Sequence, residues 1–564
     1  MQAVILAAGK GTRLGHLGKE IPKCLCSIAK KLIIERAIDN FVEANIKDFV
    51  IVINYKAEKI KEHLLKVYPE LNFTFVDEND YENIEHNNIY SLVLALPFIK
   101  KDFILVEGDI IFEVSTLKQL IKDKKSKAVL STYAPYLNGS GVVVKNNKCI
   151  ALQKYSNQEN LYKTVNLYYI SNKNKVKKDI DKFTKINGYN HYYEEAFNIK
   201  QFKPYIVEPE NWYEVDTVAD LDVANIIYSS GEEKYKLLSE RYGGHWMIPG
   251  LIDCCYLTNP FFDIHKIFNS IDLGLLASSY PAGEKETRAI AANLFNLSAD
   301  NILVGNGATE LISVLGRHYR KYPTYMTYPT FNEYDSAFDR HNKAKFEKAD
   351  VVIIVNPNNP TGDYTDPGSI LKLVDKYSSK IFIIDESFND FVEEKLKKSF
   401  IGCKYDNVIV VKSLGKSYGI NGLKLGILYS HNKKIIESLK ELMPSWNVNS
   451  ISQEVLSQLK AYESKYKLAC KELILERENL ILSLRLFNKH IKVYNTQTDF
   501  LYIKLLDVDS HKFCVDMLDK YNIFIKDLSN KKGLEGQNYI RLSINDKKTN
   551  SFVCGCFTEY FYKV

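Results

Sequence analysis

The spacing of apolar residues predicts alternating strands and helices in the first part of the chain. Four short apolar runs, at 3–8, 48–54, 71–76 and 102–109, have the length and continuity of buried strands. Between the first two runs, residues 30–44 repeat apolar side chains at helical spacing. Strands that alternate with helices indicate βαβ units, so we expect a mainly parallel sheet.

The alternation resumes in the second part of the chain. Runs at 351–355, 381–385 and 407–411 are short, β-branched and continuous, which is typical of strands buried on both faces. Beyond about residue 430 helical patterns dominate, followed by the strand-like runs "FLYIKLL" and "YIRLSI".

A break in the pattern separates the two parts. Glycines, a proline and charged residues cluster at 228–250, and we place the boundary within 229–240. The sequence therefore predicts an α/β protein with domains at 1–228 and 241–564. A chain of 564 residues is also too long for one ordinary core, since domains average roughly 150 residues.

Composition narrows the class of protein. The net charge of +6 is small against 75 basic and 69 acidic side chains, which does not favour a nucleic-acid partner. The ten cysteines include no C-x-x-C pair, so a reduced chain is the simpler interpretation. No apolar run approaches the roughly 18 residues of a membrane span, and no basic region precedes "AVILAA" as in a signal peptide. We expect a cytoplasmic protein.

The first chemical signal is the loop "LAAGKGTRLG" at 6–15, directly after the first strand. Gly9 and Gly11 would let successive backbone N–H groups point at one anion, and Lys10 and Arg13 add cationic donors. Lys23 follows in "IPKCL". Taken alone, "GKG" is equally typical of a plain turn between a strand and a helix.

With Lys23, this loop resembles the nucleotidyltransferase superfamily that makes NDP-sugars and CDP-alcohols. "HNNIYSL" and "EVDTVADL" are most similar to its choline-phosphate cytidylyltransferase branch, over most of residues 1–227. The resemblance implies a Rossmann-like, GT-A-like domain with a mixed sheet. It also implies CTP, ahead of UTP, and a small phosphorylated alcohol as substrates.

The resemblance also implies roles for single residues. Arg13 would hold the triphosphate, and Lys23 would neutralise the α-phosphate during attack. Asp109 and Asp216 would hold Mg²⁺, which prefers few carboxylates plus substrate phosphates. The implied nucleotide-binding set is Leu6, Ala8, Gly9, Gly11, Thr12, Arg13, Lys23 and Asn88. Helix capping is the competing explanation for Asn88 and Ser91, and loop or cap positions are the alternative for the two aspartates.

The second chemical signal is Lys416 in "SLGKSYG", after the run at 407–411. A lysine can hold an aldehyde cofactor as a Schiff base, and pyridoxal 5′-phosphate (PLP) also needs a carboxylate at its ring nitrogen. Asp385 ends the run at 381–385, and Asn359 lies in the turn-like "NPNNPTG". Carboxyl ends of parallel strands share one edge of a sheet, so one pocket could hold these residues.

Together these residues resemble the class I/II aminotransferase family of PLP enzymes, over roughly 241–564. The resemblance implies fold type I, Lys416 as the Schiff-base lysine and Asp385 at the ring nitrogen. Arg541 would bind the substrate carboxylate, and Tyr280 would reach the phosphate of a partner subunit in a homodimer. The remaining implied cofactor contacts are Ala308 and Thr309 of "GNGATE", Phe331, Asn359, Ser413 and Lys424.

Three positions depart from the common aminotransferase pattern. Lys424 replaces the usual arginine, Phe388 the usual tyrosine, and Phe331 stands where tyrosine is common. The pattern looks closer to histidinol-phosphate aminotransferase and threonine-phosphate decarboxylase, whose substrates are phosphorylated. Whether the reaction is transamination or decarboxylation stays open.

The two halves form one pathway if the first uses what the second makes. We expect the PLP domain to form a small phosphorylated or phosphonylated amine, and the N-terminal domain to join it to CMP. CDP-ethanolamine and the CMP ester of 2-aminoethylphosphonate are two such products. One alternative is a non-catalytic PLP-fold module for dimerisation or sensing. Another is an NDP-sugar-forming enzyme fused to an aminotransferase that is not an amino-sugar enzyme.

Overall fold

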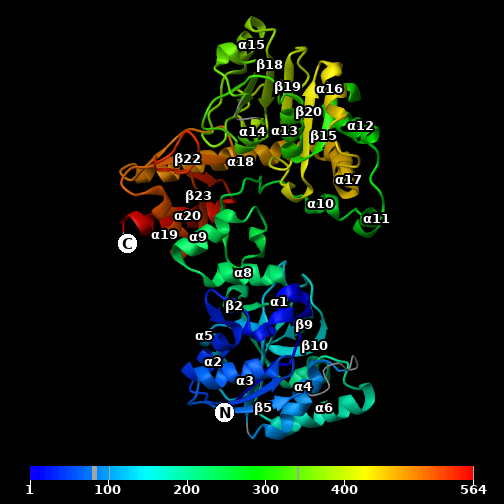
Figure 1. Cartoon of the computed structure of the whole chain (residues 1–564), viewed down its shortest axis with the longest axis vertical. Helices are drawn as coiled ribbons and strands as arrows, with labels where there is room; N and C mark the ends of the chain where they lie inside the picture. Colours follow the sequence, from blue (N-terminus) through cyan, green and yellow to red (C-terminus); the bar gives the residue numbers. More distant parts are fainter. Residues whose placement is uncertain (79–85, 101, 339–341, 563–564) are drawn as a thin grey trace. The chain divides into compact units, whose positions relative to one another are not determined.

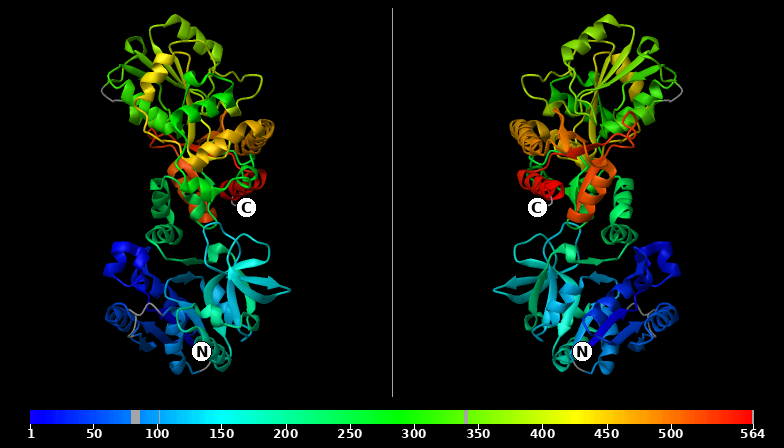
Figure 2. Two further views of the ribbon diagram at one scale, coloured as in Figure 1. Left: turned by 90° about the vertical axis from the view of Figure 1, so that its right-hand side faces the viewer. Right: turned by 90° about the vertical axis from the view of Figure 1, so that its left-hand side faces the viewer.

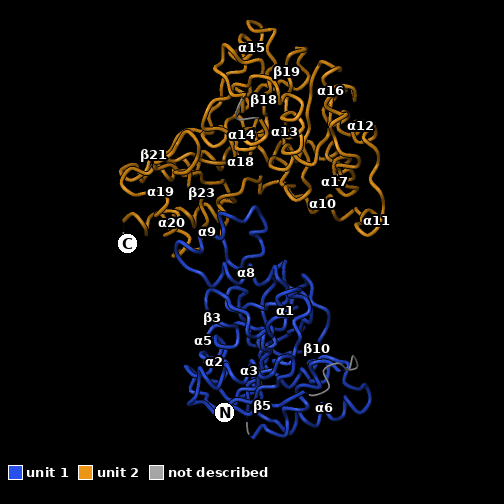
Figure 3. The backbone as a smooth tube through the Cα atoms, in the orientation of Figure 1, with its two compact units in different colours: residues 1–251 blue, residues 252–564 orange. Residues whose placement is uncertain are grey.

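The chain folds into two compact units, residues 1–251 and 252–564, in a computed structural model (Figure 3). The structure describes residues 1–78, 86–100, 102–338 and 342–562. Each unit has its own sheets, seen in Figure 1 and from two further sides in Figure 2. Helix α9 (Gly231–Glu240) occupies the stretch where the sequence indicates a boundary. The domain bounds 1–228 and 241–564 stay a prediction.

A nine-stranded sheet forms the framework of the first unit. Its parallel part has the order β5 (Asn72–Asp77), β4 (Asp48–Ile53), β1 (Gln2–Ala7) and β6 (Phe103–Glu107). Next to β6 runs antiparallel β11 (Leu161–Ile170), which also pairs with β9 (Ser140–Lys145) and β8 (Lys127–Ser131). The edges are β10 (Lys148–Lys154) and β12 (Lys203–Val207). The expected mixed sheet is confirmed.

Helices cover both faces of this sheet because its strands alternate their side chains between two cores. On β1, Ala3 and Ile5 point to one core, whereas Val4 and Leu6 point to the other. The first core receives α2 (Ile33–Glu43), α3 (Ala57–Val67) and α5 (Val114–Ile121). The second receives α4 (Asn88–Ala95), α6 (Lys173–Asn187) and α7 (Tyr193–Ala196). The helix expected at 30–44 is α2.

A short two-stranded ladder positions the acidic side of the first unit. β7 (Ile110–Phe112) follows β6 and pairs antiparallel with β13 (Trp212–Glu214), far along the chain. The N–H of Val215 donates to the carbonyl of Asp109 at 3.1 Å, which extends the pairing to the residues beside it. Helix α8 (Val218–Tyr228) then follows. The smaller elements are α1 (Gly15–Glu20), β2 (Ser27–Ile28) and β3 (Lys31–Leu32).

The second unit contains a six-stranded sheet. Its order is β15 (Ile302–Asn306), β20 (Leu425–Ser430), β19 (Val408–Ser413), β18 (Ile381–Asp385), β17 (Val351–Val355) and β16 (Thr324–Met326). The last four are parallel, and β20 runs antiparallel to both of its neighbours. All three runs expected as buried strands in this part are strands of this sheet.

Helices and a second sheet complete this unit. The helices are α10 (His265–Phe268), α11 (Leu273–Ser278), α12 (Glu284–Phe295), α13 (Gly307–His318), α14 (Asn332–Ala337), α15 (Pro367–Lys376), α16 (Lys433–Lys440), α17 (Ser450–Gln458), α18 (Glu463–Leu484), α19 (Ser510–Tyr521) and α20 (Lys547–Tyr562). The second sheet has the order β14 (Ile252–Cys254), β23 (Ile523–Asp527), β24 (Tyr539–Ser543), β22 (Phe500–Leu505) and β21 (Ile491–Val493). Within the described residues, no helix combines the length and apolar character that crossing a membrane requires.

Candidate active sites

The loop after β1 is shaped by a glycine that faces Lys23. Gly11 has φ of 66°, a left-handed conformation that side chains rarely adopt. A Cβ added at Gly11 would lie 3.2 Å from the Cβ of Lys23, whereas one added at Gly9 would have no neighbour within 4 Å. The loop therefore packs against the start of the Lys23 side chain and stays open at Gly9.

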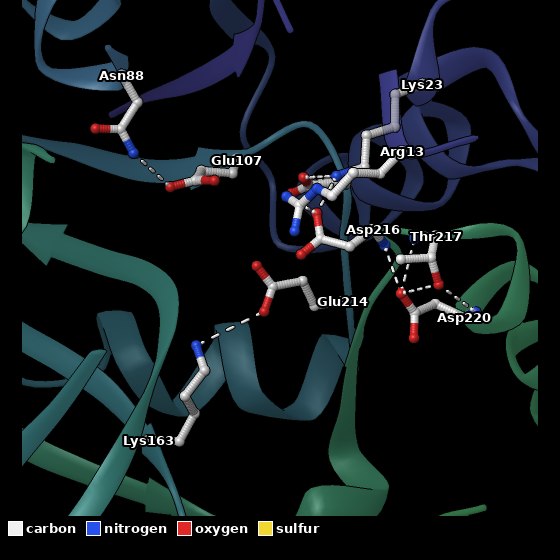
Figure 4. A network of polar contacts seen from close by, with 10 residues as sticks. Arg13, Lys23, Asn88, Glu107, Lys163, Glu214, Asp216, Thr217 and Asp220 are labelled. Atoms are coloured by element: carbon white, nitrogen blue, oxygen red, sulfur yellow. Dashed lines mark hydrogen bonds and ion pairs between the residues drawn. The ribbon is translucent and has the colours of Figure 1, made fainter. Parts of the chain in front are cut away.

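Lys23 lies between two aspartates at the centre of the first site (Figure 4). Its Nζ is 2.5 Å from Asp109 Oδ2 and 2.6 Å from Asp216 Oδ1. Arg13 Nη2 is 2.7 Å from the same Asp216 oxygen. The structure thus brings together the two predicted catalytic cations and the two predicted metal ligands.

The electrostatics of Lys23 follow from this geometry. Burial opposes a charge on the amine, but the carboxylates of Asp109 and Asp216 outweigh that effect and raise its pKa. Lys23 therefore stays protonated at neutral pH. A cation held here can balance charge that develops on a phosphate.

The loop that carries Asp216 is fixed by a helix cap. Thr217 is the N-cap of α8, and Asp220 Oδ2 accepts hydrogen bonds from the N–H of Asp216 at 3.1 Å and of Thr217 at 2.7 Å. Both backbone donors at the start of the helix are thereby satisfied. Asp216 enters the site from a rigid turn, and its own side chain does not cap the helix.

A hollow of about 380 Å³ opens beside this cluster. Its lining includes the predicted nucleotide-binding residues Leu6, Ala8, Gly9, Gly11, Thr12, Arg13, Lys23 and Asn88, and both predicted metal ligands, Asp109 and Asp216. The structure therefore gathers the whole predicted set around one space.

The structure also separates Asn88 and Ser91 from helix capping. The side chain of Asn87, not Asn88, accepts the capping hydrogen bond of α4. Asn88 Nδ2 instead donates to Glu107 Oε1 at 3.1 Å, and Ser91 Oγ donates to Glu78 Oε2 at 2.5 Å. Both side chains line the hollow.

Sequence reasoning missed two carboxylates of this site, Glu107 and Glu214. Each lies two residues before a predicted metal ligand, at the end of β6 and of β13. Both stand in the same three-residue pattern, Glu-x-Asp, at the end of a strand, and this repeated pattern is the signal that could have found them. Burial raises the pKa of Glu107, and the neighbouring Asp109, Glu194 and Glu214 add to the shift.

The two aspartates suit a divalent cation. Asp109 Oδ1 is buried and has no hydrogen-bond partner among the described residues. A carboxylate oxygen without a donor fits a hard cation, and Mg²⁺ takes one or two such ligands with substrate phosphates. Among the described residues no cluster of three or more His, Cys, Asp or Glu side chains could hold a metal by itself. The protein alone thus offers only part of a coordination shell.

In the second unit, Lys416 lies in the turn after β19. Its Nζ lies 4.8 Å from the ring centre of Phe388 and 5.8 Å from that of Phe331. Burial lowers the pKa of this amine, while the carboxylates of Asp385 and Asp499 act in the opposite direction. A buried lysine with a lowered pKa is suited to react with an aldehyde.

Asp385 ends β18 and is 3% exposed. Its Oδ2 accepts a hydrogen bond from the hydroxyl of Tyr334 at 2.9 Å, and its Oδ1 accepts one from the N–H of Ser387 at 2.8 Å. Tyr334 was not predicted, because its link to Asp385 crosses from α14 to β18. The two donors fix the orientation of the carboxylate, as a partner for a ring nitrogen requires.

Asn359 and Arg541 meet directly. Arg541 Nη1 donates to Asn359 Oδ1 at 2.8 Å, and its Nη2 donates to the carbonyl of Cys255 at 2.7 Å. Arg541 Nε is buried and has no partner among the described residues. The structure thus brings the predicted carboxylate clamp to the predicted ring contact.

The predicted phosphate contacts gather where β15, β20 and β19 lie side by side. Gly426 pairs with Gly305 on one side and with Ser413 on the other, and α13 begins just after β15 at Gly307. A Cβ added at Gly307 would lie 3.4 Å from Lys424 Cε. Lys424 therefore lies beside the start of α13, whose first turn contains Ala308 and Thr309, and a helix N-terminus of this kind can bind an anion.

Phe388 and Tyr280, two further positions singled out in the sequence, differ from each other in their surroundings. Phe388 is buried and packs edge-on against Phe500 at 5.4 Å, so it forms an apolar wall beside Lys416. Tyr280 is 85% exposed and contacts the ring of Trp446 at 5.2 Å. No contact between described residues joins Tyr280 to the other predicted PLP residues.

Asp499, just before β22, is a buried carboxylate that sequence reasoning missed. It is 1% exposed, and neither carboxylate oxygen has a hydrogen-bond partner among the described residues. Burial raises its pKa to about 6, against the pull of Lys416 and Arg541. Together with the unpartnered Arg541 Nε, it leaves polar groups in this unit that a cofactor and substrate could satisfy, so the residues fit PLP.

Comparison with known proteins supports the family expected for each half of the chain. The family described as nucleotidyl transferase matches residues 2–140, and the family described as aminotransferase class I and II matches residues 317–554. PLP is the cofactor of the second family.

Three relatives illustrate the range of similar proteins. CMP-5′-(3-aminopropyl)phosphonate synthase of Streptomyces rubellomurinus is 23% identical over 99% of this chain and 95% of its own length. L-serine phosphate decarboxylase of Sulfurospirillum multivorans is 29% identical over 59% of this chain and 97% of its own length. Histidinol-phosphate aminotransferase of Caldanaerobacter subterraneus subsp. tengcongensis is 30% identical over 53% of this chain and 87% of its own length.

A solved structure identifies the fold of the second half. L-threonine-O-3-phosphate decarboxylase from Porphyromonas gingivalis covers 56% of this chain and all of its own, with 23% identity and a TM-score of 0.50. That likeness shows the type I fold of PLP-dependent enzymes. The chain therefore belongs to the class I and II aminotransferase family through its second unit, and carries a nucleotidyltransferase in its first.

Proposed function

We propose that this chain is a bifunctional enzyme that makes the CMP ester of a small amine carrying a phosphate or phosphonate. Its second unit forms the amine from an amino acid, and its first unit joins the amine to CMP from CTP. The observation that carries the proposal is the match of both halves to one CMP-phosphonate synthase, over 99% of this chain. The Lys23 cluster and the Lys416 surroundings supply the chemistry.

In the first unit, an oxygen of the acceptor phosphate or phosphonate attacks the α-phosphorus of CTP. The new P–O bond forms as the bond to the leaving pyrophosphate breaks. Arg13 and the N–H groups of the glycine loop would hold the leaving phosphates. Lys23 would balance the charge on the α-phosphate.

Mg²⁺ at Asp109 and Asp216 is part of the proposal. Its support is the unpartnered Asp109 Oδ1 and the closeness of both carboxylates to Lys23. When bound, the ion would neutralise phosphate charge in the attack.

In the second unit, Lys416 would hold PLP, Asp385 its ring nitrogen, and the start of α13 with Lys424 its phosphate. PLP supplies an electron sink when bound. We favour decarboxylation over transamination because the L-serine phosphate decarboxylase match covers 97% of that relative. The amino acid then loses CO₂, and Cα gains a proton in its place. Lys416 Nζ is suited to carry that proton, because burial lowers its pKa.

The test supplies the full-length protein with PLP, Mg²⁺, CTP and either phosphoserine or 2-amino-3-phosphonopropionate. We expect CO₂ and pyrophosphate, with a CMP ester of the amine identified by mass spectrometry. Formation of a keto acid instead of CO₂ would show transamination. Absence of pyrophosphate with every supplied amine and amino acid would refute the function of the first unit.

Two variants assign the steps to the units. Lys416→Ala should stop CO₂ release but leave pyrophosphate release from a supplied amine, and Lys23→Ala should do the reverse. Exposed Lys372→Ala and Lys66→Ala serve as the matched controls in the second and first unit. Loss of both activities in either variant would contradict two independent sites.

Assembly and location complete the proposal. We propose a homodimer through the second unit, supported by the exposure of Tyr280, which would then reach a partner's phosphate site. Sedimentation velocity checks the mass, and Tyr280→Phe should weaken PLP retention. We propose a cytoplasmic location, supported by ten cysteines that are all free thiols. Cell fractionation tests it.

A further inference from the structure

A second hollow, of about 500 Å³, adjoins the glycine-loop hollow. Arg13, Glu107, Asp109, Tyr192 and Asp216 line both spaces. The two hollows therefore meet at the Lys23 cluster, where the proposed phosphorus transfer takes place. Two substrates that enter from opposite sides would meet there.

Two buried glutamates line the second hollow. Glu214 lines it from the end of β13, where Figure 4 shows it between Lys163 and Asp216, and Glu194 lines it from α7. Glu194 is only 3% exposed, and its Oε2 has no hydrogen-bond partner among the described residues. Burial raises the pKa of Glu194 to about 7. A buried carboxylate oxygen without a donor is costly unless a ligand with hydrogen-bond donors completes it.

One buried lysine of the protein, Lys163, lines the same hollow, and it already has an ion-pair partner and a hydrogen-bond acceptor. Lys163 Nζ lies 3.6 Å from Glu214 Oε2 and donates to the carbonyl of Thr164 at 2.7 Å. One lysine beside two glutamates leaves an excess negative charge. A small cation with hydrogen-bond donors would therefore balance the remaining negative charge of Glu194 and Glu214.

We propose that the second hollow binds the ammonium group of the acceptor, with the carboxylates of Glu194 and Glu214 as its counter-charge. This inference rests on the proposed function and names the substrate class of the first unit: a primary amine with a phosphate or phosphonate at its other end. The ammonium end lies in the acidic hollow, and the anionic end lies toward Lys23 and Arg13.

The negative charge of Glu194 and Glu214 also determines which of the two reactions comes first. An amino acid acceptor would bring its own carboxylate next to Glu194 and Glu214, where like charges repel. Lys163 already has Glu214 and the carbonyl of Thr164 as partners, and Lys154, the other lysine of the lining, is exposed to solvent, so neither is a buried, unpaired cation. The amine formed after loss of CO₂ is thus the acceptor, and decarboxylation comes first.

The test measures pyrophosphate release by the full-length protein with CTP and three acceptors: 2-aminoethylphosphonate, ethylphosphonate and 2-amino-3-phosphonopropionate. PLP is removed beforehand, so that the amino acid is not converted during the assay. We expect the amine to have a kcat/KM about 10- to 100-fold above the other two, the usual effect of a charge-assisted hydrogen bond.

Glu194→Gln and Glu214→Gln keep side-chain shape and remove the charge. Each should raise the KM of the amine about 10-fold or more, a larger change than it causes in the KM of CTP or in the turnover of ethylphosphonate. Exposed Glu159→Gln is the matched control, and thermal unfolding verifies that each variant folds.

The outcomes separate this inference from the proposed function. Turnover of all three acceptors at similar rates, or equal loss with amine and ethylphosphonate in both variants, would refute the amine site and leave the nucleotidyltransferase in place. A preference for the amino acid would refute the order of reactions and the charge of Glu194 and Glu214 as its cause. No turnover of any acceptor would overturn the proposed function, and the amine site with it.

Discussion

Two buried carboxylates of the second unit show how neighbours decide the behaviour of a single residue. Glu386 Oε1 accepts from the N–H of Phe400 at 2.5 Å, and its Oε2 accepts from the hydroxyl of Ser399 at 2.6 Å. Asp499 has no such donors among the described residues. Glu386 is therefore held by local structure, whereas Asp499 is balanced mainly by the charges of Lys416 and Arg541, which lie far from it in the sequence.

Glu386 predicts a pH dependence of stability. Burial raises the pKa of Glu386 to about 7, above the usual 4.5 of a glutamate. Below pH 4.5 the Glu386 carboxyl is protonated in both the folded and the unfolded state. Between pH 4.5 and 7 it is protonated only in the folded state. Wild type should thus lose up to about 3 kcal/mol of unfolding free energy as the pH rises through this window.

Glu386→Gln should abolish that loss, because an amide can still accept from Phe400 and donate to Ser399. The measurement is urea unfolding of the second unit at pH 5 and pH 8, for wild type and variant. An identical change between the two pH values in both proteins would contradict the assignment.

Sequence reasoning identified the candidate residues that lie in short, local motifs. Lys23, Asp109, Asp216, Lys416, Asp385 and Arg541 lie in recognisable short motifs. The first three meet in one ion-pair cluster, and the last three interact electrostatically, while their roles stay predictions. Tyr334, Glu194 and Asp499 were missed because their roles come from contacts across long stretches of chain. Tyr334 in α14, for example, matters only because it donates to Asp385 at the end of β18.

At the scale of elements, strands were predicted better than their pairing. Runs buried on both faces, such as 351–355, are continuous and easy to recognise. The ladder of β7 and β13 joins positions about one hundred residues apart, and its short strands carry no periodic signal. The place where Asp109 and Asp216 meet was therefore not predictable from pattern alone.

A close contact between strand β20 and helix α13 gives the next prediction. A Cβ added at Gly426 in β20 would lie 2.5 Å from Ala308 N, in the first turn of α13. Gly426→Ala should push this turn away from β20 at a cost of about 1–3 kcal/mol in unfolding free energy. Because the turn is the proposed phosphate site of PLP, cofactor affinity should fall as well.

PLP titration followed by absorbance, together with thermal unfolding, measures both effects. Gly422→Ala is the matched control, since a Cβ added there has no neighbour within 4 Å. If Gly426→Ala binds PLP as tightly as wild type, the start of α13 does not hold its phosphate.

At the scale of the whole molecule, each unit has its own cores and its own set of polar residues. The two proposed activities should therefore respond to different treatments. EDTA should stop pyrophosphate release and spare CO₂ release, and removal of PLP with hydroxylamine should do the opposite. Assays of both products after each treatment check this, and re-addition of Mg²⁺ or PLP should restore the lost activity. Loss of both activities after one treatment would indicate dependence between the units.

The ion pairs of Lys23 have a consequence for how the first unit is loaded. A triphosphate that arrives alone meets an ammonium already balanced by Asp109 and Asp216, and a divalent ion that arrives alone meets carboxylates already balanced by that ammonium. Each ligand frees the group that the other needs. Nucleotide and metal should thus reinforce each other's affinity by the same factor, and stray inorganic phosphate should compete poorly.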